Sequence, residues 1–227
     1  MSRSLLIALL AALALPGLAL AANVKGTSGD DTLTGTPKTD RIFGKAGNDK
    51  IDGLAGNDRL FGGRGNDSVN GGDGNDGIHG GGGDDTTDGG AGDDRISGGK
   101  GKDTLKGGAG NDRLFGGRGN DTVDGGDGND RIHGGKGDDT IDGGEGNDRI
   151  HAGHGADKVT AGAGDDVVWV RDHKADTVDC GAGEDTVFAD KADTLTNCEH
   201  AKVRRGHGKP GKPKPTHPPH PPKPHHS

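Results

Sequence analysis

The most regular chemical feature of this sequence is an aspartate that recurs at every ninth position. From Gly26 to Trp169 the chain divides into sixteen nine-residue units without an insertion, and the sixth position of every unit is Asp. A carboxylate is the hard oxygen ligand that Ca²⁺ selects, so we expect these side chains to bind calcium. They are Asp31, Asp40, Asp49, Asp58, Asp67, Asp76, Asp85, Asp94, Asp103, Asp112, Asp121, Asp130, Asp139, Asp148, Asp157 and Asp166.

Glycines accompany each aspartate. Position 4 is Gly in fifteen units, with Lys38 the exception, and position 1 is Gly in fourteen, with Ala152 and Ala161 the exceptions. Glycines at positions 1, 2 and 4 allow positive φ and let backbone carbonyls approach a common point, so backbone oxygens are expected to join the carboxylates. The predicted carbonyl ligands are Gly62, Gly71, Gly80, Gly89, Gly98, Gly107, Gly116, Gly125, Gly134 and Gly143.

The elements that must position these ligands are very short strands. Positions 7 to 9 predict one strand per unit, with the aliphatic position 8 pointing inward; Thr87 is the one non-aliphatic residue there. Each unit is then one turn plus one strand, and two units complete an 18-residue coil. We therefore predict an all-β fold, a parallel β-roll (β-solenoid) of about eight coils with two short-stranded parallel sheets.

Stacked coils place like charges over one another. Asp58 is expected over Asp76, and Asp67 over Asp85, at the strand spacing of about 4.8 Å. Carboxylates so close repel unless a cation lies between them. Seven gaps on each edge predict up to about 14 calcium ions, and the chain should fold only when they bind. The first two units lack glycine at position 2, so their sites should be weaker.

The units follow the pattern GGxGxDxUx, where U is a large aliphatic residue; Gly62–Asn70 (GGRGNDSVN) and Gly134–Asp142 (GGKGDDTID) are examples. This pattern resembles the calcium-binding nonapeptide repeat of the RTX (repeats-in-toxin, hemolysin-type) family. The resemblance implies a β-roll with calcium in its turns. The segment Asn57–Asp67 recurs word for word as Asn111–Asp121, six units further along, which indicates duplication of a six-unit block.

The composition alone would favour disorder, since aromatic residues make up 2% and hydrophobic residues 26% of the chain. The strict register argues against a disordered linker. EF-hands are disfavoured because flanking helices and a glutamate at the twelfth loop position are not predicted, and an ice-binding solenoid because position 3 is chemically mixed. Residues 22–200 hold 20 basic and 36 acidic side chains, which favours a cation over nucleic acid as the main partner.

An enzyme would need a catalytic constellation, and the sequence shows neither HExxH nor GxSxG. Histidines such as His79, His133 and His151 fall at the outward position 9 and are interpreted as solvated strand surface. We predict no enzymatic activity. A hydrolase or epimerase acting on extracellular polysaccharide is the alternative from another functional class.

Residues 1–21 predict a cleaved signal peptide: Arg3 is followed by an apolar run and then by Ala19-Leu20-Ala21. An N-terminal anchor is the alternative, but the run is short and interrupted at Pro16. The protein is expected to be secreted and extracellular, without a transmembrane anchor. RTX proteins exported by the type I route lack such a peptide, so neither toxicity nor that route is carried over, and we expect a structural or interaction module.

Residues 22–169 form the repeat region, and residues 170–203 are expected to be degenerate repeats that cap the roll. The cap segment DTVDCGAGEDTVFADKADTLTNCE resembles the C-terminal end of secreted RTX-like proteins of high-G+C Gram-positive bacteria. Cys180 and Cys198 are separated by the length of one full coil, so they should lie on adjacent coils within disulfide reach. In an exported protein, this pair predicts a disulfide bond.

Residues 204–227 form a tail rich in Pro, His and Lys that should be extended and disordered. Three interpretations remain open: a tether to an anionic cell-wall or extracellular polymer, weak transition-metal binding, and an expression tag. The prolines that interrupt the histidines disfavour the tag. The metal-binding candidates are His217, His220, His225 and His226.

Overall fold

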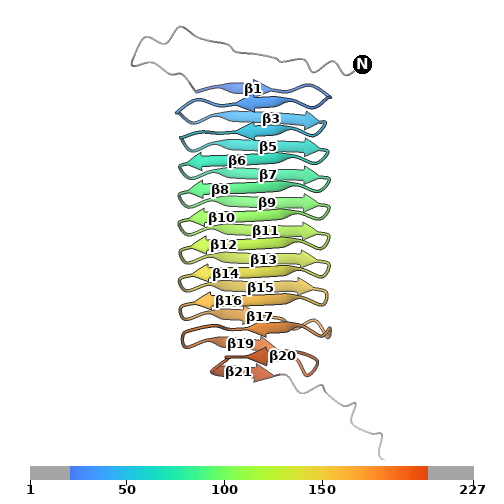
Figure 1. Ribbon diagram of the computed structural model, residues 1–227, viewed down its shortest axis with the longest axis vertical. Helices are drawn as coiled ribbons and strands as arrows, with labels where there is room; N and C mark the ends of the chain where they lie inside the picture. The colour runs from blue at the N-terminus through green and yellow to red at the C-terminus, as the bar shows by residue number, and fades with distance from the viewer. Residues whose placement is uncertain (1–20, 204–227) are drawn as a thin grey trace, which may run out of the picture.

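The computed structural model describes residues 21–203, which form a single column of coiled β-strands (Figure 1). Residues 1–20 of the predicted signal peptide and the whole predicted disordered tail lie outside the described residues. Twenty-one strands alternate between two parallel sheets, so the all-β parallel solenoid is confirmed. No helix of the described part is long and apolar enough to cross a bilayer.

The odd-numbered strands form one sheet, called here the odd sheet. Its eleven strands are β1 (Asn23–Lys25), β3 (Arg41–Ala46), β5 (Arg59–Arg64), β7 (Gly77–Gly82), β9 (Arg95–Lys100), β11 (Arg113–Arg118), β13 (Arg131–Lys136), β15 (Arg149–His154), β17 (Val167–Trp169), β19 (Thr186–Ala189) and β21 (His200–Val203). They follow one another along the column in chain order.

The even-numbered strands form the opposite sheet, called here the even sheet. Its ten strands are β2 (Thr32–Thr34), β4 (Lys50–Asp52), β6 (Ser68–Asp73), β8 (Thr86–Ala91), β10 (Thr104–Ala109), β12 (Thr122–Asp127), β14 (Thr140–Glu145), β16 (Lys158–Ala163), β18 (Thr177–Asp179) and β20 (Thr194–Thr196). The column therefore has about ten turns, because the degenerate repeats after Trp169 continue the coil beyond the eight turns that the regular repeats supply.

Strand pairing has a constant offset of one coil through the regular repeats. Leu105 pairs with Val123, and Leu114 with Ile132, in each case the equivalent residue of the next coil. Most strands are longer than the predicted three residues: they run from position 7 to position 3 of the next unit, as Arg95–Lys100 does. The reason is that glycines at positions 1 and 2 remain in the hydrogen-bonded ladder, so the turn is confined to positions 4 to 6.

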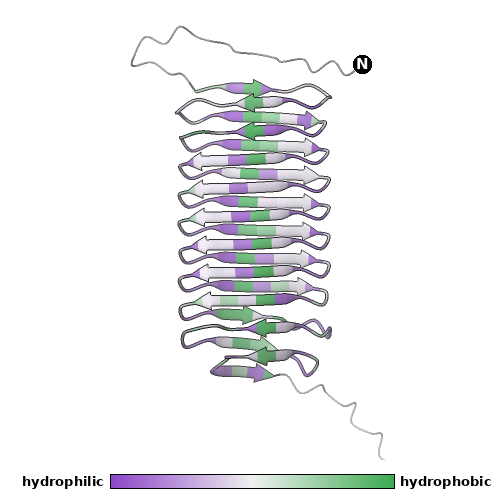
Figure 2. Cartoon of the chain, in the orientation of Figure 1, coloured by the Kyte–Doolittle hydropathy of each residue, from purple (hydrophilic) through white to green (hydrophobic). Residues whose placement is uncertain are grey.

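The core is a double row of aliphatic side chains between the sheets. Position-8 residues such as Ile42, Leu60, Ile96 and Leu114 are fully buried, and the apolar stripe runs down the middle of the strands (Figure 2). The flanking positions 7 and 9 face solvent or are half-buried, as the two-residue period of a strand requires. Each strand of the regular repeats thus contributes one large side chain, at position 8, to the core.

The regular offset changes where the cap begins. Lys158 pairs with Thr177, one position beyond a full coil, and Thr177 pairs with Thr194, one position short of a full coil. The predicted disulfide is confirmed: Cys180 and Cys198 are bonded, with their Cα atoms 5.2 Å apart. Because Asp179 pairs with Thr196, Cys198 stands only one position past the point opposite Cys180, which leaves the two thiols within reach of each other.

Thr87 is the weak point of the core. It occupies position 8 between Val69 and Leu105, is 1% exposed, and its hydroxyl Oγ1 has no hydrogen-bond partner. Thr87→Val replaces the hydroxyl with a methyl group of the same shape, so it should raise the free energy of unfolding by about 1–2 kcal/mol. Urea denaturation in saturating calcium measures this.

Thr86→Val is the matched control, because the same chemical change there falls on an exposed outward position. It should alter the free energy of unfolding by less than about 0.5 kcal/mol. Equal effects of the two substitutions would contradict the assignment of Thr87 as a buried defect.

Candidate metal centres along the edges of the roll

All sixteen predicted carboxylates lie in the turns and are buried. Asp31 is 8% exposed and the other fifteen are 3% exposed or less. Ionised carboxylates are rarely buried to this degree without a partner that compensates the lost hydration. What each carboxylate contacts therefore decides what the turns can do.

From Asp40 onward, one oxygen of each carboxylate accepts a hydrogen bond from the backbone of the preceding coil. Oδ1 of Asp94 accepts a hydrogen bond from the amide of Asp76 at 2.7 Å, and Oδ1 of Asp112 accepts one from the amide of Asp94 at 2.7 Å. The same bond repeats along both edges; Asp58 donates to Asp76, and Asp67 to Asp85, as the predicted stacking requires. The aspartates of loops n and n+2 are thus directly linked.

The other carboxylate oxygen is buried without a hydrogen-bond partner in sixteen turns of the described chain. A charge-bearing oxygen left in this state is strongly unfavourable unless a cation or a proton reaches it. The atoms are Oδ2 of Asp49, Asp58, Asp67, Asp76, Asp85, Asp94, Asp103, Asp112, Asp121, Asp130, Asp139, Asp148, Asp157, Asp166, Asp176 and Asp185.

From Asp49 to Asp148, each unpartnered oxygen lies beside the space that a position-1 glycine leaves open, as Gly107 illustrates. A Cβ atom on Gly107 would lie less than 3.0 Å from both Oδ2 of Asp112 and the carbonyl oxygen of Gly125. Gly107 has no positive φ, so its role is to leave room, whereas the positive φ values belong to positions 2 and 4. Of the two roles expected for the glycines, position 1 therefore fulfils the close approach of oxygens and not the positive φ.

Nine of the ten predicted carbonyls occur in this arrangement, each next to the carboxylate of the preceding coil. They belong to Gly62, Gly71, Gly80, Gly89, Gly98, Gly107, Gly125, Gly134 and Gly143. At Gly98 the atoms nearest to an added Cβ all belong to Asp103, so the carbonyl of Gly116 is not counted with the nine. Two oxygens from successive coils thus converge at one place, which is a donor set that suits Ca²⁺.

The first two turns differ from the rest. Thr27 donates its hydroxyl to Oδ2 of Asp31 at 3.0 Å, and the Thr36 amide donates to Oδ2 of Asp40 at 2.5 Å. These threonines stand at position 2, where the next two units have Lys45 and Leu54 and the units from Gly62 to Trp169 have glycine. Their hydrogen bonds satisfy the oxygen that is unpartnered elsewhere, which supports the expectation of weaker sites at this end.

Two further aspartates belong to the series. Asp176 and Asp185 lie in the cap, are buried, and have the same unpartnered Oδ2 as the regular turns. Their Oδ1 atoms accept from the amides of Asp157 and Asp166, each 19 residues earlier. A fixed nine-residue count misses them because the cap has one extra residue; the motif Asp-Thr-Val that begins at each was the available signal.

Position 5 forms a second ladder that the repeat analysis did not assign. The side-chain oxygen of Asn111 accepts from the amide of Asn129 at 3.0 Å, and that of Asn129 accepts from Asn147 at 2.8 Å. Asn and Asp both carry the required acceptor, which explains why both occur there. This exposed ladder holds successive turns in register beside the buried carboxylates.

The electrostatics of the turns favour protonation of the carboxylates when no cation is bound. Burial raises the pKa of Asp85, Asp94, Asp139 and Asp148 to about 7, and nearby aspartates add to the effect while backbone hydrogen bonds oppose it. Within the described residues, no three acidic, His or Cys side chains form a metal-binding cluster. The turns thus offer one carboxylate at a time, with backbone oxygens around it.

A parallel solenoid with glycine-rich turns and a buried carboxylate in each is the architecture of a nonapeptide-repeat calcium-binding protein. The chain belongs to the RTX calcium-binding nonapeptide repeat family, whose four-copy model matches residues 25–60, 52–87, 88–123, 107–141, 124–158 and 133–168. These matches span most of the roll and confirm the family resemblance. No curated protein matches the chain.

Gly107→Ala tests whether the space at position 1 matters. The new Cβ would meet the oxygens of Asp112 and Gly125, so the substitution should destabilise the calcium-saturated roll by about 1–3 kcal/mol and weaken calcium binding. Isothermal titration and urea denaturation measure the two effects. Gly82→Ala is the control, since a Cβ there meets nothing within 4 Å; equal effects would contradict the crowding argument.

Calcium binding should also depend on pH. Calcium requires ionised carboxylates, and protons compete for the aspartates whose pKa is raised to about 7. The calcium midpoint should therefore rise at least about tenfold between pH 7.5 and 5.5. A midpoint that does not change over this range would show that these groups do not govern binding.

In EDTA, where no calcium is bound, lower pH should favour the folded state instead of opposing it. An acid with a raised folded-state pKa stabilises the fold at low pH relative to neutral pH, because the unfolded chain ionises first, near pH 4. The calcium-free chain should therefore retain more structure at pH 4.5 than at pH 7.5. Circular dichroism at the two values checks this.

Proposed function

We propose that the chain is an exported calcium-binding module that folds when calcium fills its turns and then serves as a structural or interaction element. The observation that carries this proposal is the row of sixteen buried carboxylate oxygens without a hydrogen-bond partner. Each would leave a charge uncompensated in the folded chain at neutral pH. A divalent cation in each turn removes that penalty and links two coils.

The proposed ligands are the position-6 carboxylates together with the position-1 carbonyls. Because carboxylates occur singly along each edge, backbone oxygens must supply most of the ligands, as is usual for Ca²⁺ with its six to eight oxygens. Asp176 and Asp185 extend the proposed series into the cap. Asp31 and Asp40, whose Oδ2 atoms accept hydrogen bonds from threonines, are proposed as weak sites. The expected number of ions is therefore up to about 14.

The proposed location is outside the cell. Calcium is abundant there, and the Cys180–Cys198 disulfide suits an oxidising compartment. The signal peptide proposed for residues 1–21 would deliver the unfolded chain to that side of the membrane. The proposed tether function of the basic tail, toward an anionic wall or extracellular polymer, falls on residues 204–227 and stays a prediction.

We propose no catalytic role and no toxicity for this chain by itself. The outward histidines lie on open strand surface: His79, His133 and His151 are exposed at position 9 of the odd sheet. The aspartates whose pKa is raised to about 7 are all committed to the stacked turns. The geometry therefore supports a scaffold in preference to a hydrolase or epimerase.

Circular dichroism of the purified, disulfide-intact chain tests the proposal directly. In EDTA at pH 7.5 the spectrum should be that of an unfolded chain, and added CaCl₂ should produce a β-sheet spectrum with a midpoint of about 10⁻⁴–10⁻³ M, the range of extracellular calcium modules. Magnesium at the same concentrations is the control and should not replace calcium, because it demands tight octahedral geometry. A β-sheet spectrum that is identical in EDTA and calcium would overturn the proposal.

A further inference from the structure

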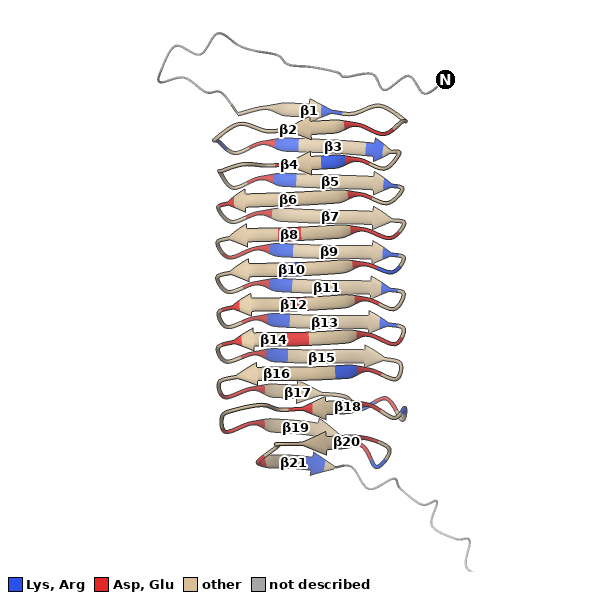
Figure 3. Ribbon diagram, viewed as in Figure 1, with Lys and Arg blue, Asp and Glu red and all other residues tan. Residues whose placement is uncertain are grey.

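The two outer faces of the roll carry opposite charge. The odd strands from β3 to β15 contain eleven Lys or Arg residues and no Asp or Glu, whereas the even strands from β4 to β16 contain seven acidic residues and three lysines (Figure 3). The separation arises because successive nine-residue units belong to opposite sheets. A chain that is acidic overall thus presents one basic surface, called here the basic face: the outward side of β3 to β15 in the odd sheet.

The cations of the basic face stand in two columns along the axis of the roll. Position 7 supplies Arg41, Arg59, Arg95, Arg113, Arg131 and Arg149, and position 3 supplies Arg64, Lys100, Arg118 and Lys136. All ten side chains are exposed. Since neighbouring strands are about 4.8 Å apart, the position-7 column extends for roughly 30 Å. Both columns are interrupted at β7, where Gly77 and Gly82 stand, and are regular from β9 to β13, so this stretch suits a polymer with regularly repeated negative charges.

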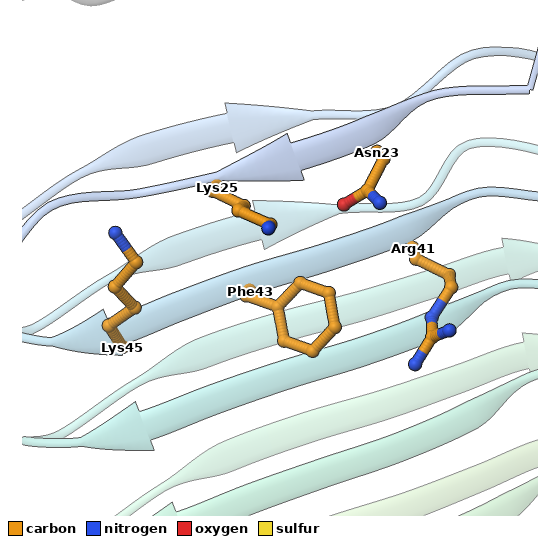
Figure 4. Close-up of a pocket in the computed structure, with 5 residues that line it drawn as sticks. All are labelled: Asn23, Lys25, Arg41, Phe43 and Lys45. Atoms are coloured by element: carbon orange, nitrogen blue, oxygen red, sulfur yellow. The ribbon is translucent and has the colours of Figure 1, made fainter.

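A groove follows the position-3 column. It has a volume of about 640 Å³ and crosses the strands from β7 to β15, with Lys100, Arg118, Lys136, His133 and His154 along its sides. Its floor consists of position-2 glycines such as Gly99 and Gly117, which leave the backbone uncovered. A smaller hollow of about 410 Å³ lies at the N-terminal end of the same sheet, between Lys25, Arg41, Phe43 and Lys45 (Figure 4).

Aromatic rings lie on the same sheet, and most of them stack on one another. Trp169 lies between His151 and Phe188, nearly parallel to both, with ring centroids 4.2 and 5.6 Å away. Phe43 stacks on Phe61 at 4.9 Å. Single-stranded nucleic acid is held largely by bases stacked on open aromatic faces. Along the groove from β7 to β15 the one phenylalanine is Phe115, and the Arg95 guanidinium lies over its ring at 4.9 Å. The basic face therefore favours a ligand that is held by charge and hydrogen bonds.

We propose that the basic face binds a linear acidic polysaccharide, one chain of which lies in the groove along the axis of the roll. Carboxylate or sulfate groups would pair with Lys100, Arg118 and Lys136, and sugar hydroxyls would bond to the histidines and the exposed glycine backbone. The inference rests on the proposed calcium-dependent fold, because the columns exist only in the stacked roll. It concerns the folded face and is independent of the tail.

Fluorescently labelled dextran sulfate and carboxymethyl dextran, each compared with unmodified dextran, test this by fluorescence anisotropy in 5 mM CaCl₂. The charged polymers should bind and the neutral one should not. The triple variant Lys100→Gln, Arg118→Gln, Lys136→Gln should weaken binding about tenfold or more, as expected when three ion contacts of a salt-dependent complex are lost. Preference between the two charged polymers identifies the anionic group.

The matched control is the triple variant Lys50→Gln, Lys106→Gln, Lys158→Gln, which changes net charge equally but lies on the even sheet. It should bind within about twofold of the unmodified protein. Circular dichroism in calcium must show that both variants are folded. If the protein does not fold in calcium, the proposed function fails; if folded protein does not bind, or both variants lose affinity equally, the polysaccharide inference alone is overturned.

Two further outcomes would overturn the inference in favour of another occupant. An oligo-dT that displaces dextran sulfate at equal charge concentration would assign the face to nucleic acid. Polymer-free self-association that is abolished by the groove variant, measured by sedimentation velocity, would assign it to the acidic even face of a second copy. Binding of the charged dextrans by a monomer, resistant to oligo-dT, supports the inference.

Discussion

The structure depends on a buried carboxylate in each turn, of which only one oxygen has a hydrogen-bond partner. In the regular turns from Asp49 onward, Oδ1 is bound by the amide of the adjacent coil, while Oδ2 is buried with no hydrogen-bond donor. The first contact fixes the spacing between coils, and the second leaves a negative charge that has to be neutralised. The same aspartate side chain therefore links adjacent coils and creates the need for a cation.

Glycine makes this arrangement sterically feasible in two different ways. At positions 2 and 4 it supplies the positive φ that reverses the chain within three residues, as Gly117 and Gly119 do with φ of 120° and 129°. At position 1 it leaves room for two oxygens, as Gly107 does. Toward the cap, Ala152, Val170 and Ala189 are buried where the odd sheet would continue the position-1 row. The cap thus replaces open space with apolar packing and closes with a disulfide.

The nine-residue period was enough to predict the coil, the inward aliphatic row, the stacked aspartates and the cysteine pair. It was not enough for Asp176 and Asp185, because a single inserted residue breaks the count while strand pairing absorbs it by lengthening one coil. Nor did it reveal the basic face, although the alternation of Arg-Ile-His with Thr-Ile-Asp at positions 7 to 9 contains that information. Charge averaged over the whole chain concealed it, since the two sheets carry opposite signs.

Alternation between sheets also restricts how such a gene can change in length. Successive nine-residue units belong to opposite sheets. Adding a single unit would therefore move every later unit to the other sheet and exchange the outer surfaces of the roll beyond that point. Adding whole coils leaves each surface intact. The repeated segments Asn57–Asp67 and Asn111–Asp121 are displaced by six units, which make three complete coils, and each copy contains one complete strand of the odd sheet, β5 or β11. The heritable module of this protein is therefore the 18-residue coil, and its two faces can diverge independently while the interior remains constant.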